Sequence, residues 1–157
     1  MIQNNQPLVE ISRVFQVSRE LMFSAWTQPE MIKRWLHPGP DWSNPFMELD
    51  LAVGGQYRLG FSHPEEAGIH VVGGSFVEIV LLERLVYTWT WEPPHDDAGI
   101  ETLVTILFSD SNDGTLVKLT HERFPDKRLC DMHKDGWIET LGCLDSLVDS
   151  GINQERE

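Results

Sequence analysis

Basic residues and long apolar runs are scarce in this chain of 157 residues. Its 12 lysine and arginine residues stand against 25 acidic ones, which gives a net charge of −13. Such a charge repels nucleic-acid phosphates and anionic membrane surfaces, so we expect neither as a partner. No apolar run approaches the roughly 18 residues that cross a bilayer. Residues 1–10 lack the basic start and apolar stretch of a secretory signal, so we expect none.

Cysteine is equally sparse, with only Cys130 and Cys143. Both fall in one predicted helix, where thirteen residues correspond to about 20 Å at ~1.5 Å per residue. A disulfide needs Cα atoms within about 7 Å, so the two thiols cannot pair within that helix. Free thiols are typical of a reducing compartment, and we expect a cytoplasmic protein. The length predicts a single domain, residues 1–157, with a core of about 8–150.

The chain also lacks the common motifs of metal, phosphate and nucleophile chemistry. None of its six histidines forms an i, i+4 pair, and there is no HExxH sequence. No phosphate-binding glycine loop and no recognisable order of nucleophile, histidine and acid is present. We therefore expect no metal ion and no cofactor.

Apolar periodicity and turn residues divide the chain into alternating strands and helices. Ser18 is a predicted N-cap, and Thr27 with Glu30 resembles a capping box that opens a second helix. A Gly73-Gly74 pair inside one strand predicts a bulge. The predicted strands are 9–17, 46–53, 56–62, 69–80, 85–91, 101–108 and 115–122, and the helices are 19–26, one that opens at Thr27, and about 125–150.

This order predicts an α+β helix-grip fold. A curved antiparallel β-sheet would wrap around the long C-terminal helix, with two short helices after the first strand. The helix presents a buried stripe that includes Trp137 and Leu141. Small residues on or beside that stripe, Gly136, Thr140 and Cys143, favour a cavity between helix and sheet.

Several segments together resemble a known family. They are VSRELMFSAWTQPEMIKRW, DLAVGGQYR, GGSFVEIVLLERLVYTWTW, TLVTILF with GTLVKLTHERF, and HKDGWIETLGCLDSLV. The chain resembles the single-domain relatives of the C-terminal domain of the heat-shock ATPase activator, within the START-like, birch-pollen-allergen-like helix-grip superfamily. That resemblance implies the fold and a link to stress response. The family includes ligand binders and cyclase-like proteins, and it supplies no shared catalytic or metal-binding set.

Aromatic side chains are the main candidates for a binding site. Six tryptophans are many for this length, and aromatic rings suit a pocket for a flat or apolar molecule. For each candidate the alternative is ordinary core packing, a stiff connecting loop or a surface polar group. The candidate ligand-binding residues are Trp35, His37, Trp42, Tyr57, Phe61, Glu78, Trp89, Trp91, His121, His133 and Trp137.

Three functions are compatible with these residues. The leading hypothesis is a small-molecule binding protein with an internal hydrophobic cavity for an apolar or aromatic ligand. A cyclase- or hydrolase-like enzyme would use His121, Glu78 or Tyr57 as proton donor or acceptor in the same cavity. A chaperone-associated interaction module, with a protein partner, follows from family analogy alone. A homodimer through the strand at 9–17 is a further hypothesis.

Overall fold

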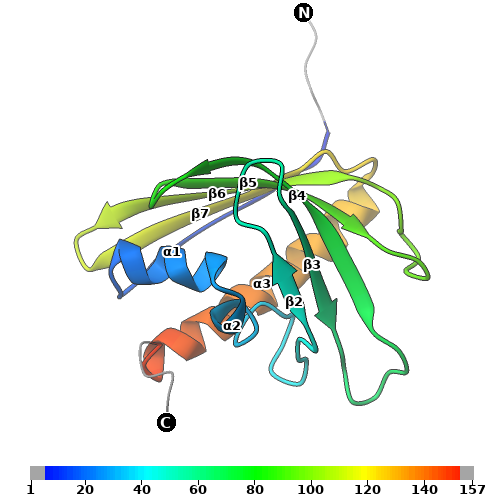
Figure 1. Cartoon of the computed structure of the whole chain (residues 1–157), viewed down its shortest axis with the longest axis horizontal. Helices are drawn as coiled ribbons and strands as arrows, with labels where there is room; N and C mark the ends of the chain where they lie inside the picture. The colour runs from blue at the N-terminus through cyan, green and yellow to red at the C-terminus, as the bar shows by residue number, and fades with distance from the viewer. Residues whose placement is uncertain (1–5, 153–157) are drawn as a thin grey trace, which may run out of the picture.

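A computed structural model describes residues 6–152, in which seven strands and three helices follow one another (Figure 1). In chain order these elements are β1 (Val9–Phe15), α1 (Arg19–Thr27), α2 (Pro29–Ile32), β2 (Met47–Leu49), β3 (Gln56–Phe61), β4 (His70–Val80), β5 (Arg84–Trp91), β6 (Thr102–Ser111), β7 (Gly114–Glu122) and α3 (Lys127–Asp149).

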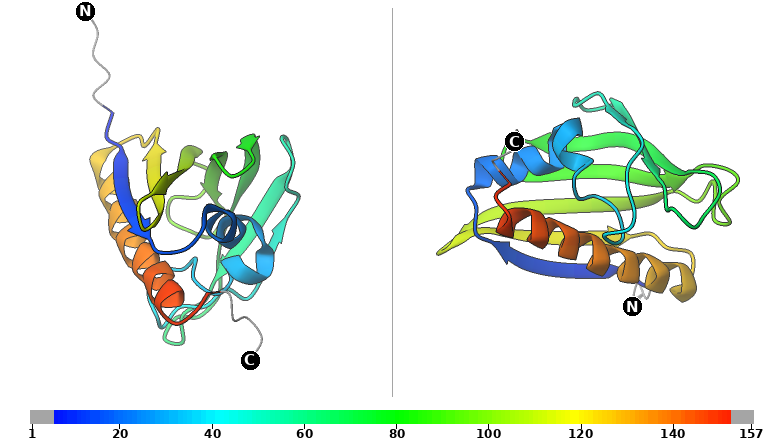
Figure 2. Two further views of the ribbon diagram at one scale, coloured as in Figure 1. Left: turned by 90° about the vertical axis from the view of Figure 1, so that its left-hand side faces the viewer. Right: turned by 90° about the horizontal axis from the view of Figure 1, so that it is seen from below.

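The strands form one antiparallel sheet in the order β1-β7-β6-β5-β4-β3-β2. The sheet is curved, and α3 lies along its concave side together with α1 and α2 (Figure 2). This arrangement confirms the predicted α+β helix-grip fold. It gives β5, near the middle of the sheet, a face that looks towards α3.

Alternation along β5 and the stripe on α3 explain how the two elements pack. Leu85, Tyr87 and Trp89 are buried on the concave face of the strand, as their spacing predicts. On the helix, Trp137 and Leu141 are also buried. The core therefore lies between these two faces.

The start of α2 differs from the prediction. Thr27 is the last residue of α1, and its hydroxyl donates a hydrogen bond to the Phe23 carbonyl at 2.8 Å. Gln28 is the N-cap of α2, without a side-chain hydrogen bond, and Pro29 is the first helical residue. The predicted capping box at Thr27 is wrong because the threonine hydroxyl is already engaged within the preceding helix.

The irregularity in β4 also lies elsewhere than predicted. The register with β5 shifts between Phe76 and Glu78, while Gly73 pairs regularly with Thr90. Gly74 is required for another reason, because a Cβ atom there would collide with the carbonyl of Thr88 on β5. Gly73 likewise permits a close approach to β3, because a Cβ atom there would lie 2.9 Å from the Tyr57 carbonyl oxygen, and neither glycine marks the bulge.

The ends of the elements differ slightly from those predicted. Asp126 caps α3 by accepting a hydrogen bond from the Leu129 amide at 2.9 Å. Ile152, just beyond the predicted core of about 8–150, is buried. Cys130 and Cys143 are both free thiols, as predicted. Within residues 6–152, none of the helices is long and apolar enough to cross a membrane.

Candidate functional site

A pocket of about 280 Å³, open on one side, lies between the concave face of the sheet and residues 132–140 of α3. Its lining includes five tryptophan or phenylalanine residues: Trp42, Phe61, Trp89, Trp91 and Trp137. Trp89 and Trp91 are adjacent inward positions of β5, and their rings meet edge to face with centroids 5.8 Å apart. We call this space the aromatic pocket.

Helix α3 contributes small or flexible side chains to the opposite wall. Met132, Gly136 and Thr140 line the aromatic pocket at helical spacing. No heavy atom lies within 4 Å of the position that a Cβ atom of Gly136 would occupy. The open volume therefore depends in part on the absence of a side chain at residue 136.

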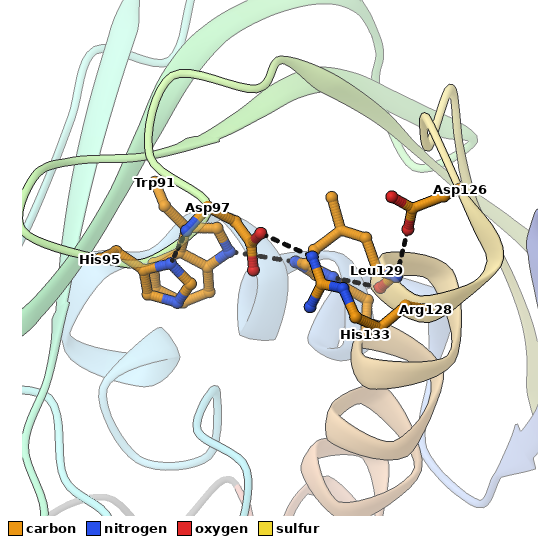
Figure 3. A network of polar contacts seen from close by, with 7 residues as sticks. All are labelled: Trp91, His95, Asp97, Asp126, Arg128, Leu129 and His133. Atoms are coloured by element: carbon orange, nitrogen blue, oxygen red, sulfur yellow. Dashed lines mark hydrogen bonds and ion pairs between the residues drawn. The ribbon is translucent and has the colours of Figure 1, made fainter.

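A hydrogen-bond chain holds Trp91 in the wall (Figure 3). Its indole Nε1–H donates to Nε2 of His133 at 3.0 Å. The Nδ1–H of His133 in turn donates to the Leu129 carbonyl at 2.9 Å. Both ring nitrogens are thus used by a neutral imidazole, and burial lowers the pKa of His133 below its ordinary value.

A second series of hydrogen bonds holds Trp137 and continues through His121 and Thr102. The indole Nε1–H of Trp137 donates to Nδ1 of His121 at 3.0 Å. His121 Nε2–H donates to the Thr102 hydroxyl at 2.7 Å, and that hydroxyl donates to the Trp89 carbonyl at 3.0 Å. Burial, and next the neighbouring His133, lower the pKa of His121 well below its ordinary value. His121 therefore supports the pocket wall and does not line the pocket.

The loop at 93–100 closes one side of the aromatic pocket. His95 stacks on Trp91, with ring centroids 4.3 Å apart and planes 7° from parallel. Its Nδ1 accepts a hydrogen bond from the Asp97 amide, and burial lowers its pKa. The Asp97 carboxylate pairs with Arg128 at 2.8 Å, which ties the loop to the start of α3 (Figure 3).

A smaller inner compartment of about 20 Å³ adjoins the aromatic pocket. Leu36 and Trp89 line both spaces and separate them. Trp26, Tyr57 and Tyr87 also line the inner compartment, together with Met47 and Leu49 of the edge strand β2. We keep the name inner compartment for this space.

Six of the eleven residues predicted from the sequence line the aromatic pocket: Trp42, Phe61, Trp89, Trp91, His133 and Trp137. Tyr57 lies in the inner compartment, where its hydroxyl donates to the Thr88 carbonyl at 2.6 Å. Burial raises the pKa of Tyr57 well above its ordinary value.

Three other predicted residues lie away from the aromatic pocket. Trp35 is fully buried, and its Nε1–H donates to the Ala25 carbonyl at 2.9 Å. His37 is hydrogen-bonded through Nδ1 to Asn44, which ties the segment after α2 to β3. Glu78 is half-exposed, with a carboxylate oxygen 3.9 Å from Nε of Arg84. We leave these three, and His121, out of the candidate site.

Sequence reasoning missed several lining residues. His95 belongs to an irregular loop, and His70 is the first residue of β4; both line the aromatic pocket. No periodic pattern marks a loop residue that folds back onto a strand, so only the three-dimensional structure reveals His95. Within residues 6–152, no group of three or more His, Cys, Asp or Glu side chains is placed to hold a metal ion.

The fold and the site define a helix-grip protein with an aromatic pocket between the sheet and the C-terminal helix. The family model described as "Activator of Hsp90 ATPase homolog 1-like protein" matches residues 16–149. The chain therefore belongs to the AHSA1-like family of START-like, birch-pollen-allergen-like folds.

Solved structures agree with this assignment. Protein CV1439 from Chromobacterium violaceum is 28% identical, with a TM-score of 0.79 over 90% of this chain and 96% of the other. The AHSA1 protein from Silicibacter pomeroyi is 20% identical, with a TM-score of 0.80 over 92% and 99%. At that identity the second likeness shows the fold alone. A search of curated proteins found no match.

Proposed function

We propose that this protein binds a small apolar or aromatic molecule in the aromatic pocket. The observation that carries the proposal is a wall of five aromatic residues around open volume. Concave, largely apolar spaces with a few fixed polar groups are the usual form of small-molecule sites. The fold commonly houses hydrophobic ligands, which is consistent with this reading.

The hydrogen bonds around the pocket favour an apolar ligand. The N–H groups of Trp91 and Trp137 already donate hydrogen bonds to the ring nitrogens of His133 and His121. Ring faces and edges are therefore what these side chains offer to a ligand. Removing apolar surface from water contributes about 25 cal/mol per Å², and stacked aromatic rings add about 0.5–1.5 kcal/mol per pair.

The enzyme hypothesis receives little support from the acid and base groups named for it. His121 is sealed behind Trp137 with both ring nitrogens engaged. The Tyr57 hydroxyl is bound to a backbone carbonyl, and Glu78 is on the surface. The chaperone-associated interaction module stays a hypothesis, as does a homodimer through β1. This strand is at the sheet edge, where an Arg13–Asp145 ion pair of 2.9 Å joins it to α3.

Two helix glycines provide a matched test. Gly136 lines the aromatic pocket, whereas Gly142 lies six residues farther along α3 and lines a separate surface depression. At both positions no heavy atom lies within 4 Å of the place that a Cβ atom would occupy, apart from the helix's own backbone and the adjacent residues. Leucine in place of either glycine should leave the helix intact, but only Gly136→Leu fills the pocket.

The experiment is calorimetric titration with 2-acetylnaphthalene, a flat apolar probe, supported by quenching of tryptophan fluorescence. We expect saturable binding to the wild type and to Gly142→Leu. Gly136→Leu should bind at least about tenfold more weakly, which corresponds to ~1.4 kcal/mol. Equal binding by the two variants, or no binding of a wider panel of aromatic probes to the wild type, would contradict the proposal.

A further inference from the structure

Two buried donors lack partners at the inner end of the site. Among residues 6–152, the indole Nε1–H groups of Trp26 and Trp89 are the buried side-chain N or O groups without a hydrogen-bond partner. Both side chains are more than nine-tenths buried, at 4% and 6% exposed. Both line the inner compartment, and Trp89 also lines the aromatic pocket. A buried donor left unpaired is unusual because it loses its hydration without gaining a new bond.

The inner compartment is the right size for a small acceptor group. A space that holds one water molecule needs about 10–15 Å³. The 20 Å³ of the inner compartment therefore accommodates one group of that size, such as a carbonyl oxygen. Leu36 and Trp89, both buried, line this space as well as the aromatic pocket. Because the Trp89 N–H is fully buried, a ligand in the pocket has to displace a neighbouring side chain, such as that of Leu36, to reach it.

The surroundings favour an uncharged ligand. Neither the pocket nor the inner compartment has a lysine or arginine among its described lining residues. His133 has both nitrogens committed, and burial lowers the pKa of both His95 and His133, which keeps them neutral. A carboxylate placed here would lose its hydration without gaining a cation, which is costly. The net charge of −13 also repels anions.

We propose that the ligand of this site is an uncharged aromatic carbonyl compound. Its ring system occupies the aromatic pocket, and its carbonyl oxygen enters the inner compartment and accepts a hydrogen bond from the Trp89 indole N–H. Aromatic ketones, aldehydes, esters and quinones belong to this class. This inference rests on the proposed function and adds the chemical class and the orientation of the ligand.

Three planar probes of nearly equal shape test the class. They are 2-acetylnaphthalene, 2-isopropenylnaphthalene, in which a methylene group replaces the carbonyl oxygen, and 2-naphthoate. The measured quantity is the ratio of dissociation constants, alkene over ketone, in each protein variant. Comparing ratios between variants cancels the difference in hydration of the two probes.

Trp89→Phe removes the unpaired N–H and keeps an aromatic ring. We expect the ratio to be about threefold to tenfold higher in the wild type than in Trp89→Phe, the range of one net hydrogen bond. Trp91→Phe is the matched control on the same strand, because its N–H already serves His133. The control should retain the wild-type ratio. 2-Naphthoate should bind the wild type at least about tenfold more weakly than the ketone.

The outcomes separate this inference from the proposed function. One outcome is that Gly136→Leu weakens binding of the probes while the alkene-to-ketone ratio of dissociation constants is equal in the wild type and Trp89→Phe. This outcome would overturn the inference and leave the proposed function standing. The inference would also be overturned if the ratio fell as much in Trp91→Phe as in Trp89→Phe, or if 2-naphthoate bound the wild type as tightly as the ketone. Failure of all probes to bind would overturn both proposals.

A measurement without any variant guards against misfolding of Trp89→Phe. The carbonyl stretch of 2-acetylnaphthalene labelled with carbon-13 can be followed by infrared difference spectroscopy on the wild-type complex. We expect a lower frequency than in hexane, because a hydrogen bond weakens the C=O bond. A frequency equal to that in hexane would overturn the inference.

Discussion

The two halves of α3 meet the sheet in different ways. In the second half, Leu141 and Leu144 are fully buried in the core. In the first half, Met132 and Gly136 face the aromatic pocket instead, and Thr140 marks where the pocket ends. Helix α3 thus packs into the core in its C-terminal half, which we call the closed half. Its N-terminal half, which we call the open half, borders the aromatic pocket.

Neighbouring elements account for part of this difference. Trp26 of α1 stacks against Trp137 at 6.2 Å, so the short helices fill the space beyond Trp137. On the other side of Trp137, the loop at 93–100 and Trp42 surround the space without filling it. The size of a few helix side chains therefore decides where the helix-grip fold is packed and where it is open.

The largest expected effect is the loss of a leucine from the closed half. Leu144→Ala should lower the free energy of unfolding by about 2–5 kcal/mol, because it leaves a cavity in a sealed core. Thr140→Ala, on the pocket wall, should change it by less than about 1 kcal/mol, since it deletes atoms next to existing space. Urea denaturation measures both, and equal losses would contradict the contrast between the halves.

Acid should weaken the open half through its buried histidines. Burial holds the folded-state pKa values of His121 and His133 below the ordinary histidine value of about 6.5, so the unfolded chain binds more protons. Stability is then fully present above pH 6.5 and falls as pH drops towards the folded-state values. The slope is about 1.4 kcal/mol per pH unit for each histidine.

The titratable and charged groups that act on His133 are His95, Asp97 and Arg128, and the one that acts on His121 is His133. The measurement is the free energy of unfolding between pH 7.5 and 5.5, in the wild type and in a His121→Gln, His133→Gln double variant. The wild type should lose stability more steeply than the variant. Parallel curves would show that neither histidine is kept neutral by the fold.

Alanine at either helix glycine should stabilise the protein by similar amounts. Gly136→Ala and Gly142→Ala each replace a poor helix former where no heavy atom crowds the new Cβ. Each should raise the free energy of unfolding by about 0.8–1 kcal/mol, measured by thermal or urea denaturation. A large loss at either position would mean that the space around it is already filled.

Surface charges should contribute least in both halves. Arg13–Asp145 beside the closed half and Lys127–Asp131 beside the open half are both partly solvent-exposed ion pairs. Asp145→Ala should lower the free energy of unfolding by less than about 1 kcal/mol at low salt, and Asp131→Ala, whose partner Lys127 is fully exposed, should have no measurable effect. A double-mutant cycle with the basic partner gives the pair energy, and a value above that limit would contradict this ranking.

The sequence predicted which side chains point towards the core better than it predicted which residues pack over them. Alternation identified Trp89 and Trp91, and helical spacing identified Trp137, because both periods follow from backbone geometry. His121 also lies on an inward strand face, but Trp137 covers it. Periodicity gives the direction of a side chain, whereas its neighbours depend on how distant elements pack.

Irregular segments explain the remaining differences. His95 reaches Trp91 only because the loop at 93–100 folds back and is tied to Arg128. The register shift in β4 depends on the pairing with β5, and Thr27 had two competing uses for its hydroxyl. Each of these features is decided by tertiary contacts that a single sequence does not encode locally.

The most direct test of the account is fluorine NMR of the protein labelled with 5-fluorotryptophan, with signals assigned from single Trp→Phe variants. On titration with 2-acetylnaphthalene, the signals of Trp42, Trp89 and Trp91 should shift most, because these rings line the aromatic pocket. Trp35, buried with its N–H bound to Ala25, should stay in place. A shift of Trp35 equal to theirs, or no shift of the pocket tryptophans at saturating probe, would contradict ligand binding in the aromatic pocket.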